Sequence, residues 1–299
     1  MDSQGDIREF LSSRRARLTP DKAGLPAYGG NRRVPGLRRE EVAMLAGVSV
    51  DYYNRLERGR ISGASDSVLE ALADALQLDE AERVHLFDLA RRSASSGSAR
   101  RKPSRPDTVR PVVQQVLDSI TGAPAWVRNA RHDHLAHNQL GRAPYSPVLT
   151  DPRRPANSAR FIYLDPAAQN FFVDWERAAD DIAAMLRSEA GRHPHDQNLQ
   201  DLIGELSTCS EDFRRRWATH NVRFHRTGVK RLHHPVVGDL TLNFEAMALS
   251  SDPDLTLLVY TADPHTPSAD ALRMLAAWAA TEEEATTVAE RSRTAPGEK

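Results

Sequence analysis

The chain has 299 residues, of which 40% are apolar, and a formal net charge of −1. This length is more than one domain ordinarily needs, so we expect two domains that each bury a core of their own. No apolar stretch approaches the roughly 18 residues of a membrane span, and the first residues show neither a secretory nor a transit pattern. These features predict a cytoplasmic protein without membrane contact. The single cysteine, Cys209, excludes an internal disulfide.

Charge and composition both change near residue 105. Residues 1–105 carry 19 Lys and Arg against 15 Asp and Glu, a net charge of +4, whereas residues 106–299 carry 21 against 26, a net charge of −5. This asymmetry predicts an N-terminal module that faces a polyanion. Residues 91–111 are mainly Ser, Gly, Pro and Arg, so we expect a flexible basic segment, either solvated or touching phosphates. The expected organisation is an N-terminal domain (1–92), a linker (93–108), a second domain (109–280) and a tail (281–299).

The N-terminal domain is predicted to consist of short helices. Apolar residues between Ile7 and Arg17 recur at the spacing of one helical face. Residues 37–60, LRREEVAMLAGVSVDYYNRLERGR, predict two further helices that cross at a steep angle. Gly47 supplies the left-handed turn that ends the first of these, and Ser49 can cap the second by accepting from its free amides. Two helices joined in this way form a helix-turn-helix, which places its second helix in the major groove of DNA.

The residues of the second helix that packing does not need form one exposed and mostly polar surface. They are Ser49, Val50, Asp51, Tyr52, Asn54, Arg55 and Arg58. Arg can bridge guanine O6 and N7, Asn can pair with adenine, and Asp can accept from cytosine N4. Arg38, Arg39 and the Ser49 hydroxyl are better suited to phosphates, which fix position without reading sequence. An ordinary solvated helix pair is the alternative, and Glu57 is expected to bond within the module.

Two more helices complete this domain. Residues 66–76 place apolar side chains on one face, and Asp79 with Glu82 forms a capping signature that opens the last helix. With these features, residues 1–92 resemble the lambda-repressor-like (Cro/C1, or XRE) helix-turn-helix family. The resemblance implies a five-helix domain that binds double-stranded DNA.

The second domain is expected to mix helices and strands. Residues 109–120 predict a helix and residues 126–129 and 134–138 two short strands. ARFIYLDP (159–166) precedes a long helix that contains Trp175, and residues 199–206 predict another helix. VRFHRTG, GVKRLHHPVVG and DLTLNFEAMAL alternate at period two from Val222 onward, and LTLLVYTA is a short apolar strand, so antiparallel strands are expected. A final helix is expected over 268–280.

Three motifs carry a second resemblance: GELSTCSEDFRRRW (204–217), HHPVVGDL around His234, and DWE (174–176). They resemble the MmyB-like ligand-binding domain over about residues 109–275. The resemblance implies an antiparallel PAS-like sheet covered by helices, which follows the same kind of DNA-binding module and encloses an apolar pocket for fatty-acid-like ligands. The expected fold class is therefore α + (α+β).

A pocket of this kind would take its apolar lining from aromatic side chains, with Arg187 or His234 to hold a carboxylate. The candidate ligand-binding residues are Trp126, Asn138, Phe161, Trp175, Arg187, Phe213, Trp217, His234 and Phe244. Aromatic residues at helical or strand spacing also form ordinary core, which is the alternative for each of them.

Enzymatic and metal-binding readings have little support in the sequence. His132 with His134, His193 with His195, and His233 with His234 are candidate metal ligands, but no HExxH or CxxC accompanies them. No GxSxG elbow, P-loop or GxGxxG occurs either. We therefore expect no enzyme, no metal and no cofactor beyond a fatty-acid-like effector.

The sequence thus predicts a transcription regulator that acts as a homodimer on an inverted repeat, because one helix-turn-helix covers few base pairs. Two alternatives stay open. The C-terminal domain could be a protein-interaction platform without ligand, or a metal-binding or enzymatic domain.

Overall fold

The structure is a computed structural model that describes residues 3–26, 34–94, 108–153, 155–278 and 281. Most of the expected linker and nearly all of the expected tail lie outside these residues. By contacts, the chain divides into two compact units. The first consists of Met1–Ser104, Ala183–Asp201 and Glu211–Phe224, and the second of Arg105–Ile182, Leu202–Ser210 and His225–Lys299.

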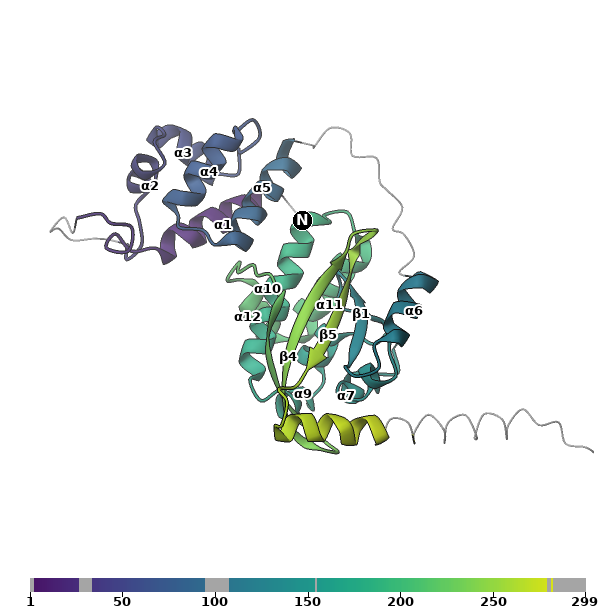
Figure 1. Cartoon of the computed structure of the whole chain (residues 1–299). Coiled ribbons are helices and arrows are strands. Elements are labelled where there is room, and N and C mark those ends of the chain that lie inside the picture. The colour runs from purple at the N-terminus through teal and green to yellow at the C-terminus, as the bar shows by residue number, and fades with distance from the viewer. Residues whose placement is uncertain (1–2, 27–33, 95–107, 154, 279–280, 282–299) are drawn as a thin grey trace, which may run out of the picture. The chain divides into compact units, whose positions relative to one another are not determined.

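The N-terminal part of the first unit is a group of helices, drawn from purple to blue in Figure 1. They are α1 (Ser3–Arg17), α2 (Arg39–Leu45), α3 (Val50–Glu57), α4 (Asp66–Ala75) and α5 (Glu80–Ala94). The five expected helices are therefore confirmed. Apolar residues from all of them form one core, in which Ile7, Tyr53 and Leu72 are fully buried.

Side chains at the helix ends explain where these helices start. The Ser65 hydroxyl accepts from the Val68 amide at the start of α4. At the start of α5, the Glu82 amide donates to Asp79 at 2.9 Å and the Asp79 amide donates to Glu82 at 3.1 Å. This reciprocal pair satisfies two amides that the helix itself leaves free, and it confirms the expected capping signature.

The C-terminal part of the chain contains further helices and a sheet. Those before the long helix are α6 (Pro111–Ser119), the 3₁₀ turn η1 (Leu140–Arg142), α7 (Ser146–Leu149), α8 (Ser158–Leu164) and α9 (Ala168–Phe171). They are followed by α10 (Trp175–Arg192), α11 (Gln197–Cys209) and α12 (Glu211–Trp217). Residues 267–278 form another helix; the expected end of this helix at residue 280 lies outside the described residues.

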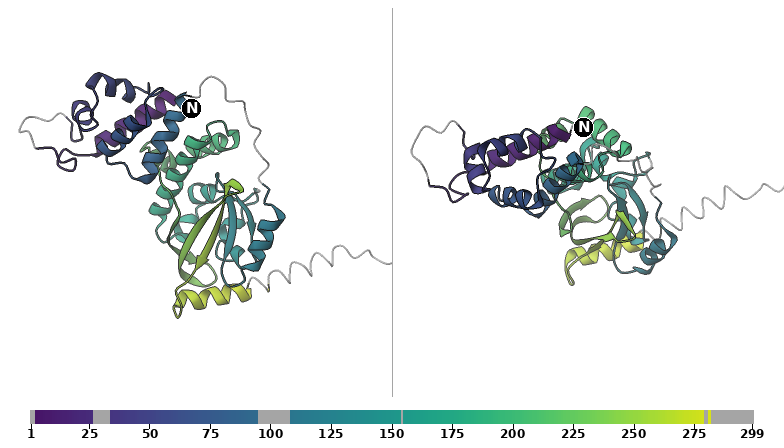
Figure 2. Two further views of the ribbon diagram at one scale, coloured as in Figure 1. Left: turned by 45° about the horizontal axis from the view of Figure 1, so that its top comes forward. Right: turned by 90° about the horizontal axis from the view of Figure 1, so that it is seen from above.

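The second unit contains a five-stranded sheet in which all neighbours are antiparallel (Figures 1 and 2). Its strands are β1 (Ala125–Asn129), β2 (His134–His137), β3 (Thr227–His234), β4 (Gly238–Leu249) and β5 (Asp252–Thr261), in the order β2-β1-β5-β4-β3. This arrangement confirms the expected antiparallel sheet with helices. The strand expected from Val222 was wrong over 222–226, because Val222 packs instead in the apolar core of the first unit.

The two faces of the sheet differ in chemistry. Val127 on β1 and Leu257 on β5 point to one face, where they pack against Val113 and Leu117 of α6. Successive side chains of a strand point to opposite faces, so Trp126 and Tyr260 belong to the other face. We call the first the α6 face and the second the aromatic face.

None of the helices in the described ranges is long and apolar enough to cross a membrane.

Candidate functional site

The turn between α2 and α3 is built by local backbone and side-chain bonds. Gly47 has a φ of +64°, the left-handed conformation expected for it, and the Val48 amide closes the turn by donating to the Ala43 carbonyl at 2.9 Å. The Ser49 hydroxyl accepts from the Tyr52 amide at 3.1 Å, which caps α3. The helix-turn-helix expected from the sequence is therefore present, with its second helix started by Ser49.

One side of α3 is fixed in the core, and this leaves the other side exposed. Tyr53 and Leu56 are buried against α2 and the rest of the apolar core. Ser49, Val50, Asp51, Arg55 and Arg58 are exposed, and Tyr52 and Asn54 are half-buried. The Arg55 guanidinium lies 5.0 Å from the centre of the Tyr52 ring, a cation–π contact within this surface. The structure thus gathers all seven predicted residues of the second helix on one surface.

Glu57 is the last residue of α3, and its buried carboxylate links this helix to α1 and α2. Its side chain is 2% exposed, and Arg15 donates to its two carboxylate oxygens at 3.0 and 2.8 Å. Arg39 donates to the same carboxylate at 3.1 Å. Burial alone would raise the pKa of Glu57, but these hydrogen bonds outweigh it and hold the pKa below its ordinary value. The expected structural role of Glu57 is confirmed.

The two arginines predicted to contact phosphates differ in their surroundings. Arg38 is exposed beside Glu40, at 3.3 Å, and its backbone amide donates to Glu41. Arg39 holds Glu57 with one nitrogen, while about half of its side chain remains exposed. Arg39 therefore has a structural task besides the predicted one.

Sequence reasoning missed two exposed apolar side chains on the neighbouring helix. Met44 and Leu45 end α2 with 63% and 37% of their surface exposed. Both directly precede the turn that starts α3. Val42 and Ala43 are the buried residues of the same helix.

Two of the predicted ligand-binding residues meet on the aromatic face of the sheet. Trp126 stacks on Tyr260, with ring centres 4.5 Å apart, and Phe244 lies 5.7 Å from Tyr260. Tyr145 packs on Trp126 at 4.5 Å. Sequence reasoning missed Tyr145 and Tyr260, although Tyr260 could have been found from the alternation within its strand.

Other predicted ligand-binding residues have their polar atoms engaged by the protein. The Asn138 side chain accepts from the amides of Ala125 and Gly141 and donates to the carbonyls of Ile120 and Ala123. These four bonds use both donors and both acceptor sites of the Asn138 carboxamide, so this side chain stabilises the segment before β1.

His234 is similarly occupied at the end of β3. Its Nε2 donates to the Ala143 carbonyl at 3.0 Å and lies 3.1 Å from the Ser146 hydroxyl, and its Nδ1 accepts from the Val236 amide. Both ring nitrogens of His234 therefore have protein partners.

Phe161 on α8 and Trp175 at the start of α10 contact neighbouring helical residues. Phe161 makes an edge contact with Phe171 of α9 at 5.6 Å, and the Trp175 indole donates to the Ile162 carbonyl at 3.1 Å. These contacts are those of ordinary core residues.

The remaining three predicted ligand-binding residues belong to the first unit. The Arg187 guanidinium stacks 3.9 Å from the Trp217 ring centre and donates to the Trp217 carbonyl, and Trp217 stacks on Phe213. Arg187 also lines a small cavity that has room for about one water molecule. The nine predicted ligand-binding residues are therefore not gathered into one site.

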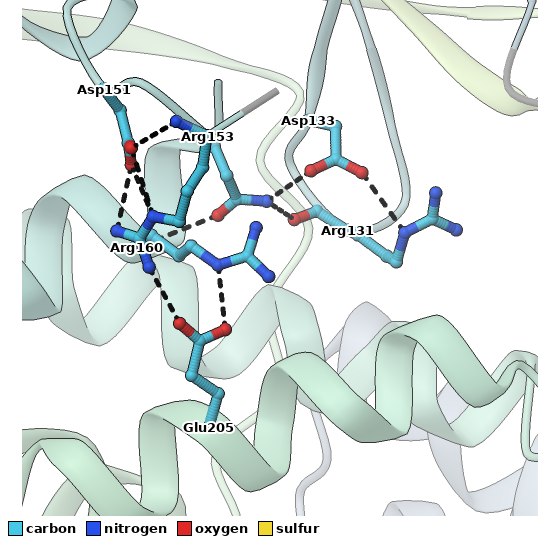
Figure 3. A network of polar contacts seen from close by, with 7 residues as sticks. Arg131, Asp133, Asp151, Arg153, Arg160 and Glu205 are labelled. Carbon is cyan, nitrogen blue, oxygen red and sulfur yellow. Dashed lines mark hydrogen bonds and ion pairs between the residues drawn. The ribbon is translucent and has the colours of Figure 1, made fainter. Parts of the chain in front are cut away.

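The turn between β1 and β2 is held by a polar network (Figure 3). Arg131 pairs with Asp133 at 3.2 Å, and the Asn157 side chain donates to Asp133 and to the Arg131 carbonyl, each at 2.7 Å. Asn157 also caps α8 by accepting from the Arg160 amide, and Arg160 donates to Glu205 of α11 at 2.8 Å. The network ties the turn to two helices of the second unit.

The candidate histidine pairs are not arranged as metal ligands. His134 lies 3.1 Å from the His137 ring through Nδ1 and 2.7 Å from the Ser158 hydroxyl through Nε2. Within the described parts of the chain, no three His, Cys, Asp or Glu side chains are grouped to hold a metal ion.

Comparison with known proteins agrees with both halves of this description. A family model of a helix-turn-helix domain matches residues 7–86, and one of the MmyB-like transcription regulator ligand binding domain matches residues 109–275. A search of curated proteins found no match. The protein is a DNA-binding transcription regulator with a ligand-binding domain, and it belongs to the MmyB-like transcription regulator family.

Proposed function

We propose that this regulator reads a specific operator with α3, as a homodimer, and that a small apolar or acyl effector controls it through the C-terminal domain. The observation that carries the first part is the exposed surface of α3. It is presented by a capped, rigidly packed helix, so its side chains meet DNA in a fixed geometry.

The side chains of this surface have separate tasks in the proposal. Arg55, Asn54 and Asp51 read base edges in the major groove, with Val50 and Tyr52 beside them. Arg38, Arg39, Arg58 and the Ser49 hydroxyl contact phosphates. Ser49 can do so while it caps α3, because its hydroxyl accepts from the Tyr52 amide and keeps its own proton to donate.

The dimer follows from the small size of this surface. Two helix-turn-helix modules on half-sites about 34 Å apart read twice as many base pairs as one. An operator complex that sediments with a single copy of the chain would contradict this part of the proposal.

The effector proposal rests on the family and on the aromatic face of the sheet. A fatty-acid-like molecule would place its apolar part against Trp126, Tyr260 and Phe244. Catalysis has no part in the proposal, and we expect the protein to act in the cytoplasm, because its proposed partner is double-stranded DNA.

The decisive experiment is selection of bound duplexes from a random pool by the full chain and by Arg55→Ala. We expect an enriched inverted repeat, and a relaxed preference at one position of each half-site in Arg55→Ala, because a bidentate base contact contributes about 1–3 kcal/mol. Arg83→Ala is the matched control. Arg83 lies on α5 and pairs with Glu70 and Asp74, so its loss changes the net charge equally without changing α3.

Salt dependence separates specific reading from charge alone. The affinity of the wild type should fall by about 0.9 log units per phosphate contact for each tenfold rise in salt, and Arg55→Ala should keep most of this slope. If no motif is enriched, or if Arg83→Ala relaxes the motif as Arg55→Ala does, the assignment of α3 as the reading helix fails.

A further inference from the structure

His132 lies in the turn between β1 and β2 with an unusual backbone. Its φ is +65°, a left-handed conformation that is uncommon for residues other than glycine, and only 2% of its surface is exposed. Holding such a residue in this conformation is unfavourable, so the surrounding structure must impose it. Strain of this kind is often found where a side chain has to be aimed.

The surrounding structure fixes this turn at several points. The Asn129 side chain accepts from the amides of Arg131 and Asp133, and it donates to the Asp133 carboxylate at 2.8 Å. The His132 carbonyl accepts from the Ser158 amide at 3.1 Å. With the network of Figure 3, these bonds hold His132 on both sides along the chain.

The imidazole of His132 has one nitrogen engaged and one without a partner. Nδ1 lies 3.3 Å from Nη1 of Arg128, and because a guanidinium only donates, Nδ1 must accept. The ring proton therefore sits on Nε2, and among the described residues no atom accepts from it. A buried donor without an acceptor is destabilising, which favours an acceptor brought by a ligand.

Charged and titratable side chains act electrostatically on this ring. Arg128 of β1, His134 of β2, Lys230 of β3 and His225, which precedes β3, all act electrostatically on His132. Burial first, and then Arg128, hold the pKa of His132 well below its ordinary value, so its ring is neutral.

Asp181 of α10 is the acidic member of this group. It lies 3.8 Å from His225 and 3.9 Å from Lys230. The charged group in contact with the His132 ring is the Arg128 guanidinium, at 3.3 Å, and a cation at this position favours an anionic acceptor.

We propose that Nε2 of His132 and the adjacent Arg128 guanidinium hold the carboxylate of the effector on the aromatic face of the sheet. This assignment rests on the effector role proposed above, and it replaces Arg187 and His234 as the carboxylate anchor. Arg128 lies two residues after Trp126 on the same strand, so the apolar part of such a ligand lies along Trp126 and Tyr260.

Calorimetric titration of the full chain with two matched pairs of probes tests this proposal. The pairs are dodecanoate with dodecan-1-ol, and benzoate with benzyl alcohol. We expect the acid of at least one pair to bind about tenfold tighter than its alcohol or more, because only the acid offers a charged acceptor. The pair that shows this preference identifies the body of the ligand as an alkyl chain or a ring.

Variants assign the preference to His132. His132→Asn keeps a residue that tolerates the left-handed backbone but removes the ring, and it should lose the preference for the acid. His265→Asn is the matched control, because His265 has a φ of +62° and is exposed; it should keep the preference. Should His132→Asn fail to fold, the ¹⁵N resonance of His132 Nε2 in the wild type should shift with the acid and not with the alcohol.

The outcomes separate this proposal from the one before it. Equal binding of acid and alcohol, or a preference that survives in His132→Asn, overturns the anchor and leaves effector sensing in place. If none of the four probes binds, the anchor is overturned together with the effector part of the proposed function. Operator selection, which uses no effector, judges the DNA-binding part independently.

Discussion

Replacing Glu57 by Gln should loosen α3 without touching its exposed surface. In the wild type, the Arg15 guanidinium makes two hydrogen bonds to the Glu57 carboxylate. The variant keeps the shape of the side chain but presents a neutral amide to this guanidinium. Breaking one partner of a buried ion pair costs about 3–5 kcal/mol. Arg15 is 15% exposed and Arg39 about half exposed, so solvent recovers part of this. We expect a loss of about 3 kcal/mol.

Hydrogen exchange of the native chain, followed by mass spectrometry, measures this loss in the peptide that contains α3. Opening of α3 should become about 100-fold more frequent in Glu57→Gln at neutral pH. Glu40→Gln is the matched control on α2; Glu40 is 62% exposed and pairs with Arg38, which is itself exposed, so less than about 0.5 kcal/mol should be lost.

The same variant has a characteristic dependence on pH. Because the folded state lowers the pKa of Glu57, its contribution is complete above the ordinary value of 4.5 and is lost as the pH falls through the folded value. The difference between wild type and Glu57→Gln should therefore shrink below pH 4.5. Equal exchange in the wild type and Glu57→Gln at pH 7, or a difference between them that grows as the pH falls, would refute the role given to Glu57.

Further predictions concern backbone, amide and imidazole groups. Gly47→Ala should lower the free energy of unfolding by about 1 kcal/mol, since its φ is +64° but the space for a Cβ is free. Gly59→Ala should lower it by at least twice as much, because an added Cβ would meet a backbone oxygen 2.4 Å away. Equal thermal midpoints of the two variants would contradict this. Asn138→Leu should lower the free energy of unfolding, measured by urea denaturation, by about 3 kcal/mol or more, since four backbone groups lose their partner; an unchanged free energy would show that they find others. Burial lowers the pKa of His134, so its neutral ring stabilises the fold fully above about pH 6.5, and stability is lost as the pH falls below that value. His134→Gln should flatten this pH dependence and His265→Gln should not, and equal slopes would contradict the prediction.

The helical module was predictable because its signals are local. The positions of Gly47 and Ser49, and the reciprocal pair of Asp79 and Glu82, follow from bonds between residues three or four apart. Such bonds leave a pattern in a short stretch of sequence. The structure confirms the five helices for this reason.

The ligand-binding residues could not be predicted equally well, because they depend on contacts between distant segments. Arg187 and Trp217 were grouped with Trp126 by residue type alone, yet they belong to different compact units. Asn138 and His234 have bonds that only the folded chain reveals. The alternation of residues 222–226 indicated a strand, but alternation does not show whether a neighbouring strand is present to pair with.

His132 shows a further limit of sequence reasoning. Its pairing with His134 suggested two rings on one face of a strand, as for a metal site. The left-handed backbone at His132 breaks that alternation and directs the two imidazoles to different partners. Nothing in the local sequence marks this conformation, which is imposed by Asn129, Asp133 and Asn157.

The division of the sheet into an α6 face and an aromatic face has a consequence for how this family can diversify. Val127 and Leu257 hold the strands to α6, whereas their immediate neighbours along the same strands face the proposed effector. Substitutions at the alternate positions that form the aromatic face can therefore change which effector is bound, while the α6 face keeps the fold unchanged. We expect relatives that respond to different effectors to differ at Trp126, Arg128 and Tyr260. They should agree at the neighbouring residues of the α6 face, such as Val127 and Leu257.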